Sequence, residues 1–138
     1  MDRKDKFGRE LLPKEETFNR IIDALKPVYH IVQIGSGKPL YHLEGIDLDL
    51  TSKTSITDLL DIALIADRFM GQVSFIIPLS ESFDKKALIV WASKGLNSQE
   101  RYISRITPRK ILHKPSSLYV MDDWPDEKIE RVLMEFIH

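Results

Sequence analysis

The sequence predicts an α/β protein with a mainly parallel sheet, and two observations carry this prediction. Stretches of strand length alternate along the chain with stretches of helical periodicity, an order typical of βαβ units. The stretch 87–91 (Ala-Leu-Ile-Val-Trp) is continuously apolar, as is typical of a strand covered on both faces. We therefore expect a three-layer, Rossmann-like domain with about five strands in one sheet.

The two helices in the first half of the chain are marked by their ends. Pro13 is expected to open a helix whose apolar residues recur at helical spacing, and Pro27 is expected to end it. Thr54 or Ser55 is expected to be the N-cap of the second helix, with Asp58 placed to complete a capping box.

The remaining elements follow from β-propensity and from turn residues between them. We expect strands over 28–34, 46–50, 68–70, 87–91 and 117–121, a loop and helix over 75–83, an irregular stretch over 92–117, and a last helix from Pro125.

Composition predicts one folded domain over 1–138, with residues 1–12 irregular. The chain is 43% hydrophobic and 30% charged, which is ordinary for a globular domain. It contains no cysteine, which excludes disulfides, thiolate metal sites and cysteine nucleophiles. The charged N-terminus has no apolar leader, so we expect a cytoplasmic location. No apolar run approaches a membrane span, and the formal charge of −1 provides no field that would attract nucleic acid.

Several local patterns have a structural interpretation that we favour over a chemical one. Gly35-Ser-Gly-Lys38 lacks the other residues of a phosphate loop and is interpreted as a turn. The four histidines lack the spacing of metal ligands, so no metal site is expected. Asp122, Asp123 and Glu127 are interpreted as acids at the N-terminus of the last helix, where the helix dipole favours negative charge.

A basic stretch precedes the last strand and could meet phosphate or nucleic acid. We favour a solvated loop, because acids elsewhere balance the charge of the chain. Its basic residues are Arg101, Arg105, Arg109, Lys110 and Lys114.

Three stretches resemble the C-terminal half of a GT-B glycosyltransferase. They are Leu50-Thr-Ser-Lys-Thr-Ser-Ile-Thr-Asp-Leu-Leu, Ala66-Asp-Arg-Phe-Met-Gly-Gln-Val-Ser, and Pro78-Leu-Ser-Glu-Ser-Phe-Asp-Lys-Lys-Ala-Leu-Ile-Val-Trp. The nearest pattern is that of the ADP-heptose heptosyltransferases, glycosyltransferase family nine, and the resemblance covers about residues 10–137. It implies a domain that binds a nucleotide-sugar donor, with backbone amides at a helix N-terminus holding the diphosphate.

The resemblance also implies where the nucleoside-diphosphate sugar binds, with Glu81 as an acid that holds the ribose hydroxyls and Asp84 as a loop acid. From the residues alone we favour the alternative, in which both acids lie on a solvated helix face. It implies no catalytic residue, metal or cofactor in this chain. The implied nucleotide-sugar contacts come from Thr54, Ser55, Gly71, Gln72, Ser74 and Glu81.

This chain departs from the family at the anion-binding loop. Val73, Phe75 and Pro78 stand where the family has Asp, Gly and His, and the acceptor domain has no counterpart. The family's Gly-Lys-Pro turn is replaced by Asp84-Lys85-Lys86. We therefore expect a donor-binding domain that is incomplete or inactive without a partner domain, and whether it is an enzyme stays open. The alternative is a non-catalytic interaction or regulatory protein, such as a small phage or accessory factor, on a degenerate glycosyltransferase scaffold.

The family's C-terminal half also begins with a strand that residues 1–12 do not resemble. In the family's order, that strand lies between the strands expected at 28–34 and 68–71. Buried backbone groups are costly to leave unpaired, so the two strands must pair directly, recruit the N-terminal segment, or accept a strand from another chain. We expect direct pairing, because residues 1–12 are mostly charged.

Overall fold

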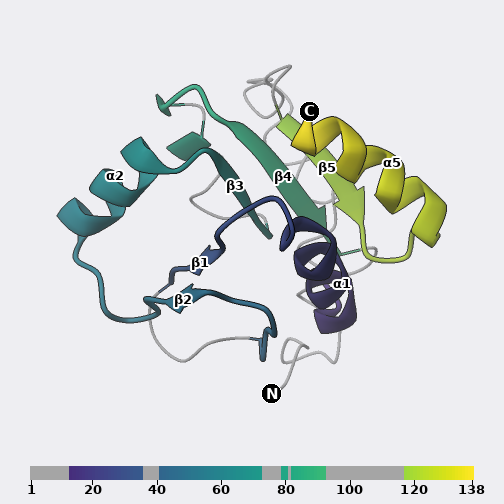
Figure 1. The fold of residues 1–138 in the computed structure, drawn as a ribbon, viewed down its shortest axis with the longest axis horizontal. Coiled ribbons are helices and arrows are strands. Elements are labelled where there is room, and N and C mark those ends of the chain that lie inside the picture. The colour runs from purple at the N-terminus through teal and green to yellow at the C-terminus, as the bar shows by residue number, and fades with distance from the viewer. Residues whose placement is uncertain (1–12, 36–40, 73–78, 81, 93–116) are drawn as a thin grey trace, which may run out of the picture.

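The computed structural model describes residues 13–35, 41–72, 79–80, 82–92 and 117–138, and it has the expected α/β character (Figure 1). Much of the expected segment 75–83 and nearly all of 92–117 lie outside the described residues. The described helices and strands are α1 (Glu15–Leu25), β1 (Val32–Gln33), β2 (Leu48–Asp49), α2 (Ile56–Ile65), β3 (Arg68–Gln72), β4 (Lys86–Trp91), β5 (Ser117–Met121) and α5 (Asp126–Ile137).

The five described strands form two parallel sheets. One contains three strands in the order β3-β4-β5, with Phe69 opposite Ala87 and Ile89 opposite Tyr119. The other is the pair β1-β2, with Val32 opposite Leu48. Parallel pairing is as expected, but β1 and β2 are each two residues long, much shorter than the expected strands over 28–34 and 46–50.

The expected direct pairing of the 28–34 strand with the 68–71 strand is wrong. β1 pairs with β2, and β3 pairs with β4. The backbone of the 28–34 segment pairs with residues 47–50 instead: the carbonyls of Ile31 and Gln33 accept the N–H groups of Asp47 and Leu50, both at 2.9 Å. Phe136, in the last turn of α5, contacts both segments. Its ring packs on Tyr29, with 6.5 Å between the ring centroids, and its carbonyl oxygen accepts a hydrogen bond from Arg68 Nε at 2.8 Å.

The central strand β4 is the axis of the hydrophobic core, as its apolar run predicts. Successive side chains of a strand point to opposite faces, and those of β4 divide between two clusters. Leu88 and Val90 pack with α1 and α5 in what we call the α1–α5 core. Ala87, Ile89 and Trp91 pack on the other face with Phe69 and Ala63 of α2, in what we call the α2-side core.

Truncation of β4 should therefore cost far more stability than truncation of α2. Leu88 is fully buried, so Leu88→Ala is expected to lower the free energy of unfolding by about 2–5 kcal/mol through lost burial and a cavity. Leu60 of α2 is 47% exposed, and Leu60→Ala should cost well under half as much. Chemical denaturation of both variants measures the difference. Equal losses would contradict the placement of the core on β4.

Candidate functional site

The candidate site lies at the carboxyl edge of β3-β4-β5, because ligands of open parallel sheets bind outside the carboxyl ends of the strands. β3 ends at Gln72, β4 at Trp91 and β5 at Met121, and parallel register brings these ends to one edge. Gly71 and Gln72, two residues of the predicted nucleotide site, therefore lie at this carboxyl edge.

Asp122 forms the β5 end of this edge and is 94% buried, with a relative exposure of 6%. Its carboxylate accepts the backbone N–H of Lys14 at 3.0 Å, and its carbonyl accepts the hydroxyl of Thr17 at 3.5 Å. Its own N–H donates to the carbonyl of Trp91 at 3.0 Å. Asp122 thus fixes the start of α1 at the carboxyl edge. The sequence analysis predicted that Asp122 lies at the N-terminus of the last helix. In the structure, its carboxylate instead binds the N-terminus of α1.

Gln72 carries the most unusual polar group at this edge. Its side-chain oxygen Oε1 is buried and has no hydrogen-bond partner in the part of the chain that the structure describes. Gln72 lies opposite Val90, so by strand alternation it shares the face of the α1–α5 core with Met70. A buried carbonyl oxygen without a donor costs free energy, and native structures contain few of them. Such an oxygen can accept a hydrogen bond from a hydroxyl or amino group of a ligand.

Thr54 and Ser55, which belong to the same predicted site, lie elsewhere. Both precede α2, whose N-terminal end projects away from the carboxyl edge of the sheet in Figure 1. Ser55 acts as a helix cap. Its hydroxyl accepts the N–H of Asp58 at 3.1 Å, and the Asp58 carboxylate accepts the N–H of Ser55 at 2.9 Å, which completes the predicted capping box. The last two predicted residues, Ser74 and Glu81, lie outside the described residues.

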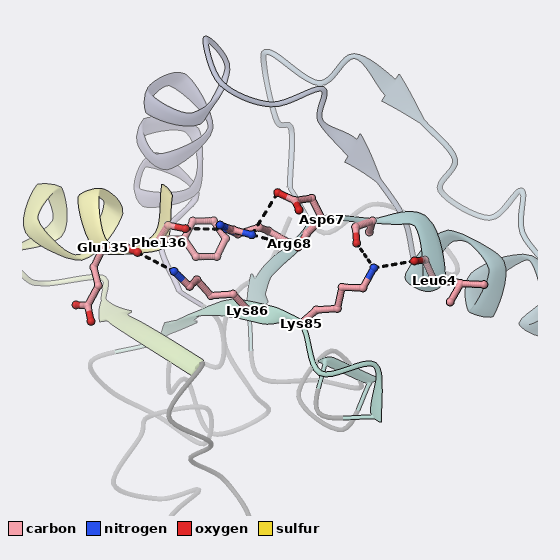
Figure 2. A network of polar contacts seen from close by, with 8 residues as sticks. Leu64, Asp67, Arg68, Lys85, Lys86, Glu135 and Phe136 are labelled. Carbon is pink, nitrogen blue, oxygen red and sulfur yellow. Dashed lines mark hydrogen bonds and ion pairs between the residues drawn. The ribbon is translucent and has the colours of Figure 1, made fainter. Parts of the chain in front are cut away.

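The opposite, amino edge of the sheet carries a basic cluster that sequence reasoning missed (Figure 2). Neither α2 nor α5 has a basic residue in its last turn. Lys85 Nζ donates to the carbonyls of Leu64, at 2.7 Å, and of Ala66. At the end of α5, Lys86 Nζ donates to the carbonyl of Glu135 at 3.0 Å. Arg68 donates through its Nε to the carbonyl of Phe136, also in the last turn of α5. Its guanidinium group forms an ion pair with Asp67 at 3.2 Å.

These cations neutralise the negative ends of two helices, so they are engaged in the fold. In the resemblance to the glycosyltransferase family, Asp84-Lys85-Lys86 stands at the position of the family's Gly-Lys-Pro turn. In the structure, the two lysines bind helix carbonyl groups. The only sequence signal for this role is negative: the last turns of α2 and α5 lack a basic residue of their own.

The chemistry available at the described part of the site is recognition by hydrogen bonding. Among the described residues, no group of three His, Asp or Glu side chains could hold a metal ion. None of the described helices has the length and apolar composition needed to cross a membrane. No family model, no curated protein and no solved structure matches this chain.

The capping box should be visible in the ionisation of Asp58. The hydrogen bonds from Ser55 hold the pKa of this carboxyl below its usual value. A lowered folded-state pKa gives a stabilisation that is present above the ordinary carboxyl pKa, near 4, and is lost as pH falls through the folded-state pKa. In Ser55→Ala, the pKa of Asp58 should rise only part of the way toward its ordinary value, because the hydroxyl is lost while the backbone N–H of residue 55 still donates to the carboxylate. NMR titration follows the change. Thr54→Ala is the matched control and should leave the pKa low; an equal pKa in all three proteins would mean that the hydroxyl of Ser55 has no part in lowering it.

Removal of the ammonium group of Lys85 should destabilise the fold. Lys85→Met keeps the aliphatic stem but leaves the carbonyls at the end of α2 without their charged donor. We expect the free energy of unfolding to fall by about 1–2 kcal/mol. The control is Arg131→Met at an exposed position in the interior of α5, away from the helix ends, with an expected change within about 0.5 kcal/mol. Similar effects of the two substitutions on denaturant unfolding would contradict the capping role.

Proposed function

We propose that this chain is a glycosyltransferase-like domain that binds a nucleotide-sugar donor at the carboxyl edge of β3-β4-β5. Under this proposal, the five strands belong to one Rossmann-type sheet between helical layers, and the domain is incomplete or inactive without a partner domain. A cytoplasmic location suits such a donor domain. The stretches between Leu50 and Trp91 that resemble heptosyltransferases support the proposal, as does the parallel order of the three strands.

The observation that carries the proposal is the side-chain oxygen Oε1 of Gln72, which has no hydrogen-bond partner among the described residues. It is buried at the edge where open parallel sheets bind ligands. A ribose hydroxyl or a base amino group would supply the missing donor. The chemistry of the site therefore suits the polar part of a nucleotide.

The direct experiment is calorimetric titration with ADP, UDP and GDP on the wild-type chain and on Gln72→Leu. Leucine removes the buried oxygen without a large change in volume, so the free energy of unfolding should stay constant or rise by up to about 1 kcal/mol. The affinity for the bound nucleotide should fall by about 1–2 kcal/mol. Gain of stability with loss of affinity would identify a binding group rather than a structural one.

Two further variants test the part of the site that comes from the resemblance alone. Ser74→Ala and Glu81→Ala should each weaken nucleotide binding by about 1–2 kcal/mol. Glu16→Ala, at an exposed position of α1, is the control and should leave the affinity unchanged. Unchanged affinity in both site variants would mean that the binding mode of the family is not kept.

The alternative function, a non-catalytic interaction protein, is favoured by a different observation. α2 buries only Ala63, while Ile56 and Ile65 at its two ends are 79% and 81% exposed. An apolar helix with so little cover is typical of a surface that meets another protein. Absence of binding for all three nucleotides in the titration above would favour this alternative.

A further inference from the structure

The helix α2 carries more apolar surface than the fold of this chain covers. Of its residues, only Thr57, Asp58 and Asp61 are polar. At 3.6 residues per turn, the apolar residues occupy more than half of the helix circumference. Only Ala63 is buried, and it packs in the α2-side core. A helix that is apolar over so wide an arc is expected to be covered on more than one side.

Three exposed residues of this arc form a stripe along α2. They are spaced by four residues, so they lie one above the other on the helix and span an arc of about 80°. We call this surface the α2 stripe, and it consists of Ile56, Leu60 and Leu64, which are 79%, 47% and 62% exposed. Ala63 lies on one flank of the stripe, and the polar residues Thr57 and Asp61 lie on the other. α2 lies at the margin of the molecule, on the side away from α5 (Figure 1), so the stripe is accessible to a partner.

The α2 stripe is symmetric about Leu60, which is the property that a contact between two identical copies requires. In a two-fold contact the same surface patch of each copy meets itself, so each position must suit its counterpart. When two α2 helices pack antiparallel with Leu60 against Leu60, Ile56 of each copy lies opposite Leu64 of the other, because both are four residues from Leu60. The contacts along the stripe are then all between large aliphatic side chains.

The charges beyond the two ends of α2 follow the same symmetry. Lys53 precedes Leu60 by seven residues, Asp67 follows it by seven, and both are exposed. The antiparallel pair therefore brings the segment of Lys53 in each copy to the segment of Asp67 in the other. A parallel pair would bring Lys53 to Lys53 and Asp67 to Asp67, and like charges across an interface are unfavourable. The helix dipoles also favour the antiparallel orientation.

We propose that two copies of this chain associate reversibly through the α2 stripe, with their α2 helices antiparallel about a two-fold axis at Leu60. The size of the surface sets the strength of the association. The stripe exposes roughly 350 Å² per copy, and a pair that also covers the flanking side chains reaches about 1,000 Å² in total, at the low end for specific interfaces. We therefore expect a weak dimer, with a Kd on the order of 10–100 μM.

A different protein suits the α2 stripe less well than a second copy. A partner of another sequence imposes no symmetry on α2, so it accounts neither for the aliphatic residues at equal distances from Leu60 nor for the opposite charges of Lys53 and Asp67. The dimer uses the same exposed helix as the alternative function, but it does not rest on nucleotide binding at the carboxyl edge. Its test runs without nucleotide, so its result and that of the nucleotide titration are independent.

The first experiment is sedimentation velocity of the full-length chain without nucleotide, over concentrations from about 5 to about 500 μM. The weight-average mass should rise from that of one chain, 16.0 kDa, toward twice that value. Leu60→Lys brings two ammonium groups together at the two-fold axis and should raise the Kd at least about tenfold.

Ile65→Lys is the matched control, because it makes the same kind of change on the same helix at an exposed position about 140° around α2 from Leu60. It should leave the Kd unchanged, and circular dichroism verifies the fold of both variants. A wild-type chain that stays at the mass of one copy throughout, or equal effects of the two substitutions, would overturn the proposal.

Cysteine cross-linking tests the orientation of the pair. The chain contains no cysteine, so an introduced thiol is the only one in its copy. A disulfide needs Cα atoms about 4.4–6.8 Å apart, which the antiparallel pair allows between residue 56 of one copy and residue 64 of the other. With oxidised glutathione as the oxidant, a mixture of Ile56→Cys and Leu64→Cys should form the mixed disulfide at least about tenfold faster than either variant links to itself.

The control is the same mixture with Leu60→Lys in both chains, which should lose this difference in rate. Self-linkage as fast as mixed linkage in the original mixture would overturn the antiparallel pairing.

Discussion

The carbonyl groups at the end of an α-helix have no partner within the helix, and the fold of this protein depends on how that constraint is met. α2 and α5 provide no basic residue in their own last turns. Lys85, Lys86 and Arg68 come instead from the amino ends of β3 and β4 and donate to those carbonyls. Each contact joins a strand start to a helix end, so the same three side chains set how the helices lie against the sheet.

This arrangement divides the two edges of the sheet by role. At the amino edge, the cations are engaged with helix carbonyls and a carboxylate (Figure 2). At the carboxyl edge, Asp122 is likewise engaged in holding the start of α1. Gln72 is different, because its buried oxygen has no partner among the described residues. A buried polar group without a partner is where binding chemistry is expected.

The half of the molecule that contains β1, β2 and α2 is packed less completely than the half that contains β4, β5 and α5. β4 is buried along most of its length, whereas β2 is exposed and α2 contributes one buried residue to the core. Both proposed functions are consistent with this difference in packing between the two halves. A donor-binding domain that needs a second domain and an interaction protein would each leave part of their surface uncovered in isolation.

The sequence by itself determined the features that depend on neighbours along the chain. The continuous burial of β4, the capping box of Ser55 and Asp58, and the last helix after Pro125 each follow from residues a few positions apart, where the run of apolar residues and side-chain chemistry are decisive. The general α/β class follows from the order of such segments.

Only the tertiary structure decided which distant groups meet. From the sequence, Lys85 and Lys86 resembled part of a glycosyltransferase turn, and Asp122 was predicted to lie at the N-terminus of the last helix. The first two bind helix ends 19 to 49 residues away, and Asp122 binds a helix start 108 residues away. The division of the strands between two sheets is likewise a matter of which distant segments meet, since the backbone of Ile31 and Gln33 bonds to residues 47–50. A sequence pattern records which groups need partners, but packing in three dimensions selects the partner, since many donors and acceptors along the chain satisfy the same chemistry.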